Sequence, residues 1–446
     1  EFRRVLFRSN HNVLFLNIPK IMGKYISLGE VNRSLLFIVL MSVSYVINQY
    51  IYGFTYIECF YPMNIYKSLY NWIVDSQKTD FPRHRVFDTL FSYIGVIIIS
   101  FFFLEKKQDF DSDNIESNAL KLIYNKKKEY YRSKIGKIHL IFIIFLWIAE
   151  ENLLLIYVDI FQDLDFWFFE LIFVSLIFGK IFSLKILSHQ KLGMAISIIV
   201  GSLLKIYNIS LTLNSDTFYA KNKSLISFVI FYFFLITLRS YVNTQVKVFF
   251  DLKFISQRAL LLLYGVVGAI MCFITGIIIT YVPCSNDMKG YVCKINYEDK
   301  LYFDNMYEYM GLGKEILARL INIILNMIAF FLLKYYDTLI IKEYTPIHVI
   351  FSFPIQYICE KTFLIILTSI FFVEDLFPKD NHLPKFLTDT SGDVGAVTGF
   401  LIYLEIIELN FCGLNYNLRK NIINRGEKEY KIALGMNAKL MEEIPD

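Results

Sequence analysis

The sequence lacks the short motifs by which common enzyme classes are identified. It contains no Gly-rich phosphate loop, no His-x-x-Glu-His-like pair, no Gly-x-Ser-x-Gly nucleophile turn and no Cys-x-x-Cys pair. Their absence argues against ATP hydrolysis and against the hydrolases and thiol oxidoreductases that carry such motifs. We therefore expect a protein that is not an enzyme and that uses no cofactor.

Histidine and cysteine are few and dispersed. The six histidines lie in different segments, whereas a metal-dependent enzyme would need several of them, or carboxylates, to converge. Four of the six cysteines lie in apolar stretches or at their ends, where they are interpreted as small apolar side chains. Cys284 and Cys293 instead share one short connection, in which we predict a disulfide, with free thiols as the alternative. No metal site is expected there.

What the sequence has is ten long apolar stretches. Each is close to the roughly 20 residues that a helix needs to cross about 30 Å of hydrocarbon. They lack the alternation of barrel strands, and in lipid only helices and closed barrels satisfy every backbone polar group. We predict an all-α membrane protein with ten transmembrane helices, at approximately 34–60, 86–104, 138–158, 166–184, 191–207, 224–246, 259–282, 314–334, 346–372 and 393–413.

The distribution of Lys and Arg predicts the orientation of these helices. The segments before the first stretch and after each even-numbered one hold 25 of these residues, while the other five connections hold 11. Because Lys and Arg favour cytosolic loops, both termini are expected in the cytosol and loop 282–313 on the opposite side. The most basic connection, 105–137, is interpreted as a solvated loop that fixes topology, and binding to anionic lipid or nucleic acid is the alternative.

Loop lengths divide the chain into two halves of five helices. The halves are 34–207 and 224–413, joined by 208–223, with cytosolic segments at 10–33 and 414–446. Residues 1–9 resemble a translated sequencing adapter and are expected to be an artefact. Since five is odd, the second half enters the membrane inverted. Inverted repeats are the usual construction of secondary transporters, whose binding site lies near the midplane where the repeats meet.

Three segments resemble one family. They are 165–170 (DFWFFE) with 184–193 (LKILSHQKLG) up to Val200-Gly201, and the Tyr344-Thr345-Pro346 step. These resemble the fourth, fifth and ninth helices of the drug/metabolite transporter superfamily, especially its solute carrier 35, nucleotide-sugar-transporter-like branch. The resemblance implies ten helices in two inverted repeats. The long seventh-to-eighth loop with two cysteines is also similar to the chloroquine-resistance-transporter-like branch. Loop 373–392 is longer than the tight hairpin usual in the superfamily, and no motif specific for nucleotide sugars is matched.

Ionisable and polar residues inside the apolar stretches are the candidate site. Charges are costly in the bilayer, so they normally face a cavity or a partner. Neighbours such as Glu150 and Glu151 point about 100° apart, so only one of each adjacent pair is expected to face the cavity. Structural ion pairing, for example of Arg239 with an acid, is the alternative. The candidates for binding solute or carrying a coupled proton are Glu150, Glu151, Arg239, Asn322, Asn326, Glu360, Lys361, Glu405 and Glu408.

Two of these candidates and one glycine motif support more specific expectations. Glu405 and Glu408 are spaced i,i+3, which places them on one face of the predicted tenth helix. The Gly-Ala-Val-Thr-Gly run at 395–399 allows close approach of another helix, either within the fold or in a homodimer.

These features together indicate a secondary transporter for a small polar organic solute, working by alternating access in an endomembrane. Its partners are the lipid bilayer and the solute, and nucleic acid is not expected. Nucleotide-sugar exchange is slightly favoured. The excess of acids over bases in the stretches supports a proton-coupled carrier of cationic or other metabolites as the alternative. A membrane scaffold or receptor that does not transport is the third interpretation.

Overall fold

The computed structural model is mainly helical, as the sequence predicted for the fold class. Each of the ten predicted stretches contains helical residues. The structure describes residues 35–44, 85–102, 133–160, 167–182, 187–213, 225–251, 253, 255–284, 295–297, 300–310, 316–359, 362, 382–411, 413–418, 421 and 424–425.

The α-helices range from five residues, in α12 and α14, to 28 residues in α13. A helix Leu35–Ser44 precedes the labelled elements, and residues 352–359 are helical again after α14. The labelled elements are α4 (Arg85–Phe102), α6 (Lys134–Ile160), α7 (Trp167–Phe182), α8 (Ser188–Leu213), α10 (Leu225–Asp251), α11 (Gln257–Tyr281), β1 (Ile295–Tyr297), β2 (Lys300–Tyr302), α12 (Met306–Met310), α13 (Ile316–Glu343), α14 (Pro346–Ile350), α16 (His382–Tyr403) and the 3₁₀ turn η3 (Leu414–Asn417).

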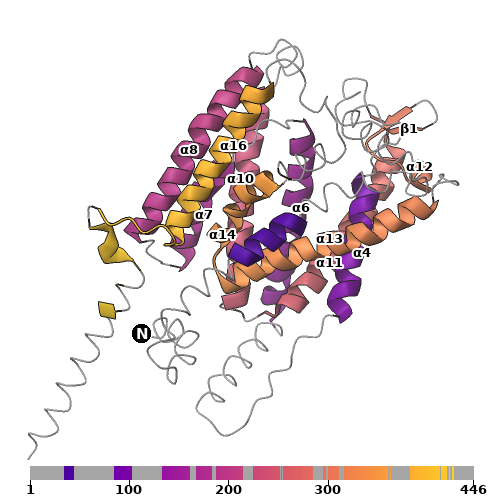
Figure 1. Ribbon diagram of the computed structural model, residues 1–446. Coiled ribbons are helices and arrows are strands. Elements are labelled where there is room, and N and C mark those ends of the chain that lie inside the picture. Colours follow the sequence, from indigo (N-terminus) through magenta and orange to yellow (C-terminus); the bar gives the residue numbers. More distant parts are fainter. Residues whose placement is uncertain are drawn as a thin grey trace, which may run out of the picture.

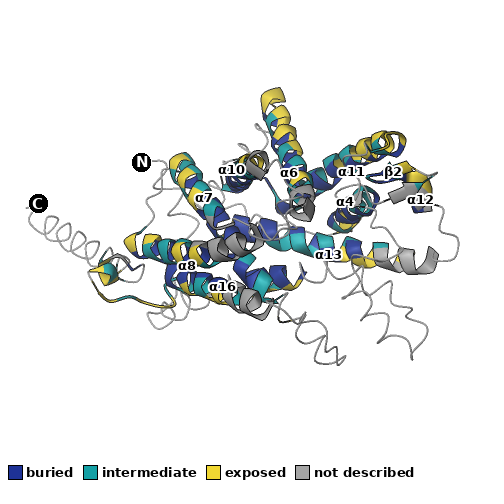
Figure 2. Cartoon of the chain, turned by 90° about the horizontal axis from the view of Figure 1, so that it is seen from above, coloured by how far each residue is buried: buried dark blue, intermediate teal, exposed yellow. Residues whose placement is uncertain are grey.

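Helices that are distant in sequence pack side by side. At one end of the molecule α8 lies along α16, and at the other end α4 lies along α11, next to the small β1–β2 hairpin (Figure 1). Helices α6 and α10 lie between these two pairs, α7 lies beside α10 and α8, and α13 contacts both α4 and α14 (Figures 1 and 2). The central helices are the ones that hold the candidate site.

Glycine determines how closely α8 and α16 approach. A Cβ added at Gly399 would lie 2.6 Å from the carbonyl oxygen of Gly193 and equally close to the backbone nitrogen of Ser197. The Ser197 hydroxyl donates a hydrogen bond of 2.8 Å to the carbonyl oxygen of Ala396 across the same contact. Small residues allow helix backbones to approach in this way. The predicted close-packing motif at 395–399 therefore contacts α8 within the same chain.

We expect Gly399→Ala to lower the free energy of unfolding by roughly 1–3 kcal/mol, because the added methyl group forces α8 and α16 apart. Gly392→Ala on the same helix is the matched control, since its Cβ would meet nothing closer than Leu204 Cβ at 3.3 Å. Thermal unfolding of both purified variants in detergent provides the measurement. Equal melting temperatures for the two variants would contradict this description of the contact.

Several predicted helix bounds are wrong, and those of α13 and α16 differ most. Helix α13 continues to Glu343, past the predicted end at 334. Helix α16 begins at His382 and ends at Tyr403, short of the predicted end at 413. Its end has the hydrogen bonds of a Schellman motif: the Ile406 N–H donates to the Leu401 carbonyl and the Glu405 N–H to the Ile402 carbonyl. Glu405 adopts the left-handed conformation (φ 63°) that glycine usually takes at this position, so no residue type marks the end of this helix.

The described parts of loop 282–313 pack against the start of α4. The Asp304 carboxylate is fully buried and accepts hydrogen bonds from the backbone N–H groups of Val86 (2.7 Å) and Phe87 (3.4 Å). These donors have no partner inside their own helix, so Asp304 caps α4 from a distance of more than 200 residues in sequence. Cys284 is disulfide-bonded. Its predicted partner, Cys293, lies outside the described residues, and the pairing between them stays a prediction.

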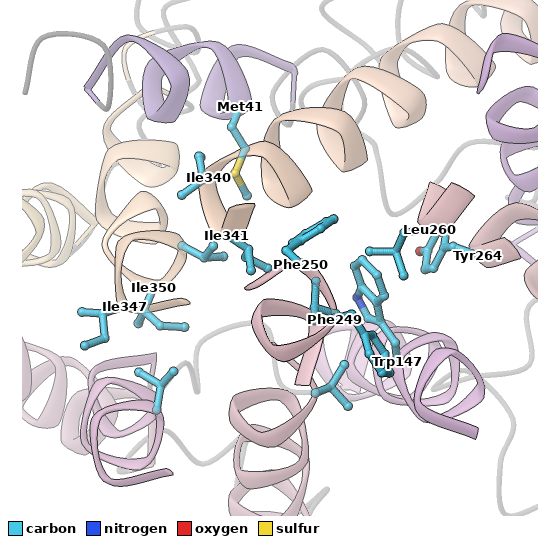
Figure 3. Packing of buried hydrophobic residues seen from close by; sticks show 14 of the residues in the cluster. Met41, Trp147, Phe249, Phe250, Leu260, Tyr264, Ile340, Ile341, Ile347 and Ile350 are labelled. Atoms are coloured by element: carbon cyan, nitrogen blue, oxygen red, sulfur yellow. The ribbon is translucent and has the colours of Figure 1, made fainter. Parts of the chain in front are cut away.

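The helices carry apolar side chains on both their inner and outer faces. Inside, Trp147 and Tyr264 pack with their ring centroids 4.7 Å apart, next to Leu260 (Figure 3). Outside, large apolar side chains such as Ile138 and Phe142 of α6 are more than half exposed. Among the described residues, Gln257–Tyr281 and Ile323–Glu343 are long and apolar enough to cross a membrane.

Candidate functional site

Two of the predicted site residues, Glu150 and Arg239, meet in the interior between α6, α7 and α10, together with Glu170. The Arg239 guanidinium forms ion pairs with Glu150 (Nε to Oε1, 3.7 Å) and Glu170 (Nη1 to Oε2, 3.5 Å). Both carboxylate side chains are 1% exposed, while Arg239 is 24% exposed. Arginine suits this position because its guanidinium remains charged and can face two acids at once. Arg239 therefore links α10 to α6 and α7.

The two ion pairs of Arg239 are longer than hydrogen bonds. At 3.5 to 3.7 Å the groups attract each other by charge but share no short, directional contact. Within the described part of the chain, neither oxygen of Glu150 accepts a hydrogen bond. The Arg239 guanidinium carbon also lies 4.6 Å from the ring centroid of Phe353, within cation–π range. The buried carboxylate of Glu150 therefore retains hydrogen-bonding capacity that a solute could use.

A second ion pair lies one residue along α6. Lys334 of α13 contacts Glu151, with 2.5 Å between Nζ and Oε1, and the Tyr264 hydroxyl of α11 donates a hydrogen bond to the other oxygen of Glu151. The side chains of Lys334 and Glu151 are 10% and 15% exposed. Glu150 and Glu151 thus both contact neighbouring helices, and the expectation that only one of them faces a cavity stays a prediction. The two carboxylates point in different directions, and each pairs with a different cation: Glu150 with Arg239 and Glu151 with Lys334.

Aromatic rings surround the Lys334 ammonium group. Its nitrogen lies 5.8, 5.7 and 5.6 Å from the ring centroids of Trp147, Tyr264 and Phe330, which we call the aromatic cage. At such distances the negative face of each ring attracts a cation. The Lys334 ammonium is therefore held by one carboxylate and by three rings that come from three different helices.

Further polar residues extend the site. Asp337 is buried one turn after Lys334 on α13. Asn152 follows Glu151 on α6 and donates hydrogen bonds to the carbonyl oxygen of Ile148 (2.7 Å) and to the Tyr93 hydroxyl (3.4 Å). Counting Asp337, the described cluster has four carboxylates and two cations, a formal charge of −2 with all groups ionised. We use "charge cluster" for Glu150, Glu151, Glu170, Arg239, Lys334 and Asp337.

The remaining predicted site residues lie elsewhere or outside the described part. The buried Asn326 donates a hydrogen bond of 2.8 Å to the Ser92 hydroxyl of α4. Glu405 and Glu408 follow the end of α16, so the prediction that they share one face of a helix is wrong, and Glu408 is exposed. The side chain of Asn322, and residues Glu360 and Lys361, lie outside the described residues.

Sequence reasoning missed three charged members of the cluster. Glu170 was noted only as the last residue of the 165–170 motif, because it lies near the start of its stretch. Lys334 is the last residue of the predicted stretch 314–334 and Asp337 lies beyond it, so neither counted as a charge inside a helix. The signal that could have identified them is the pattern of α13: Lys334 and Asp337 are followed by the apolar run Leu339-Ile340-Ile341, which continues the helix.

Known proteins do not assign a role to these residues, since no protein-family model and no curated protein matches the chain. The described residues contain no group of three or more His, Cys, Asp or Glu side chains that could hold a metal ion. The chemistry of the site is therefore inferred from its own geometry. It offers carboxylates, two cations and aromatic faces, which are groups that bind polar or charged solutes.

Proposed function

We propose that this protein is a secondary transporter that moves a small polar organic solute across a membrane by alternating access. The observation that carries this proposal is the charge cluster. Its ionisable groups lie inside a set of helices that expose large apolar side chains. Soluble proteins usually place charges outside and apolar residues inside. Here large apolar side chains are exposed on the outside, and the charge cluster is buried among apolar residues, which favours a bilayer around the helices.

The origin of the charges also supports the proposal. Glu150, Glu151 and Glu170 belong to the predicted first half, whereas Arg239 and Lys334 belong to the second. Each of these ion pairs therefore connects the two halves. In an inverted-repeat transporter the halves rock against each other around a site at their interface. Ion pairs that exchange partners with a solute would couple binding to this movement.

Helix packing is compatible with the proposed inverted repeats. Numbering helices by the ten predicted stretches, the second packs on the seventh (α4 on α11), the fourth on the ninth (α7 on α14) and the fifth on the tenth (α8 on α16). The eighth packs on the second (α13 on α4), and the third packs on the seventh (α6 on α11). In two repeats of five helices, the third and eighth helices are counterparts, and so are the second and seventh. Replacing each helix by its counterpart therefore converts the contact between the eighth and second helices into the contact between the third and seventh. Such a relation is expected of two repeats of five helices, and supports the proposed drug/metabolite-transporter-like architecture.

The sign of the charge cluster bears on the solute. A nucleotide sugar carries a pyrophosphate and needs cationic partners, and here both cations already face carboxylates. Four acids against two bases suit a cationic solute or a coupled proton better. We therefore now favour a solute with a positive charge over a nucleotide sugar. An endomembrane location remains part of the proposal.

Uptake by purified protein in proteoliposomes tests the proposed function. The protein is expected to accumulate at least one labelled solute from a panel that includes organic cations, amino acids and nucleotide sugars, with and without a pH gradient. Empty liposomes control for leakage. If every member of the panel equilibrates at the rate seen in empty liposomes under both conditions, the transport proposal is contradicted and the interpretation as a scaffold or receptor is favoured.

A further inference from the structure

The surroundings of Lys334 have the chemistry of a receptor for an ammonium group. A carboxylate and several aromatic faces around one cation are the groups by which proteins recognise organic ammonium ligands. Here Glu151 supplies the carboxylate at 2.5 Å, and the aromatic cage supplies three ring faces within 6 Å of the nitrogen. The occupant is the protein's own lysine.

We propose that Glu151 and the aromatic cage form an ammonium-binding site, that Lys334 occupies it in the described state, and that the ammonium group of an organic cation replaces Lys334 there during transport. This inference rests on the proposed transport function and names its substrate class. Lysine is suited to the role of a displaceable occupant because its ammonium is carried on a flexible four-carbon stem.

A displaced Lys334 would still have an anion nearby. Asp337 is buried one helical turn further along α13, and residues at i and i+3 are neighbours on a helix surface. Lys334 could therefore move from Glu151 to Asp337 without leaving its charge buried and unpaired, which would be costly. Lys334 thus has two acid partners within reach. When it pairs with Glu151 it fills the ammonium-binding site, and when it pairs with Asp337 it leaves that site vacant for a ligand.

The same surroundings disfavour other ligands. An anion would meet the Glu151 carboxylate and the negative faces of three rings. A hard metal cation such as Ca²⁺ or Mg²⁺ requires six or more oxygen ligands, and the three rings carry one oxygen, the Tyr264 hydroxyl, which already donates to Glu151. A primary ammonium group interacts favourably with both the carboxylate and the aromatic cage, because its N–H groups donate hydrogen bonds to the carboxylate while its charge faces the rings.

Chemical rescue of Lys334→Ala tests the proposal by stability rather than by transport. Truncation to alanine removes three carbons and the nitrogen, the same heavy atoms that propylammonium contains. We expect propylammonium to raise the melting temperature of the purified variant in a saturable way, by roughly 2 °C or more. The unmodified protein should respond only at a higher amine concentration, because the amine must first displace the tethered lysine. Expression with and without propylammonium shows whether the amine also restores folding of the variant.

Three controls separate the site from general effects of the amine. Propanol matches the shape of propylammonium without its charge and should give no shift. The double variant Glu151→Gln/Lys334→Ala lacks the carboxylate and should lose the response. Lys342→Ala removes an exposed lysine from the same helix and should respond only as the unmodified protein does.

A Lys334→Ala variant that shows no amine-dependent gain, either in melting temperature or in recovery of folded protein, overturns the ammonium site. An equal response to propanol overturns it as well. Because the readout is stability, this outcome is distinguishable from failure of the transport proposal, which is decided by uptake in proteoliposomes.

Discussion

Arg239→Gln is expected to abolish solute uptake and to lower the melting temperature. Arg239 is the cation that faces both Glu150 and Glu170, and each of these carboxylates is 1% exposed. Without it Glu150 keeps no ion pair to a described residue, and a buried charge left unpaired in this way costs about 3–5 kcal/mol. Uptake by proteoliposomes and thermal unfolding in detergent should be measured on the same preparation.

Two further substitutions show whether the effect belongs to the site. Arg239→Lys keeps the positive charge but loses the planar guanidinium group, which can face two acids at once. This variant should therefore be more stable than Arg239→Gln, while its uptake activity should still be low. Arg258→Gln removes an arginine at the start of α11, where the guanidinium donates to the Phe101 carbonyl (2.6 Å), and should leave uptake largely intact. Uptake by Arg239→Gln at the rate of the unmodified protein would show that Arg239 has no role in transport.

Glu151→Gln is expected to have the second large effect. The substitution removes the carboxylate that contacts Lys334 and accepts the hydrogen bond from Tyr264, in a place where Lys334 is only 10% exposed. We expect a loss of about 3 kcal/mol of stability together with loss of uptake, because removing one partner of a buried ion pair leaves the other uncompensated. Thermal unfolding of this variant can be compared with that of Glu343→Gln, which changes an exposed acid on α13.

The double variant Glu151→Gln/Lys334→Met resolves the origin of that loss. With both charges removed, no unpaired ion remains, so stability should return close to that of the unmodified protein while uptake stays absent. A double variant as unstable as the sum of the two single variants would mean that Glu151 and Lys334 are not energetically coupled. The ion pair would then not be the reason for the loss.

The helices could be predicted because their signal is local. Ten runs of apolar residues mark ten places where helix is found, and each run can be recognised without knowing what packs against it. The close contact of Gly399 with α8 was indicated in the same way, by two glycines four residues apart. The ends of the helices were harder to predict from the sequence. Glu405 at the left-handed end of α16 gives no local signal, since glycine is the residue expected there.

The partners within the site could not be predicted because they depend on which helices meet. Sequence analysis selected Glu150, Glu151 and Arg239 from their cost in lipid, and the structure brings all three into one cluster. Nothing in the sequence pairs residue 151 with residue 334, since that contact depends on how α6 and α13 pack. Lys334 was also difficult to recognise as a site residue, because it lies where the apolar run is interrupted by polar residues, although α13 continues beyond it to Glu343.

The central claim is that the charge cluster becomes accessible from each side of the membrane in turn. Asn152 is the position to examine, because it follows Glu151 on α6 and its amide contacts the Tyr93 hydroxyl. In a background without other free cysteines, Asn152→Cys should be placed in sealed proteoliposomes and treated with a membrane-impermeant thiol reagent, supplied outside or trapped inside. Alternating access predicts labelling from both sides, at rates that change when an organic ammonium solute is added. Labelling that stays restricted to one side, or is absent from both, with and without solute, would contradict it.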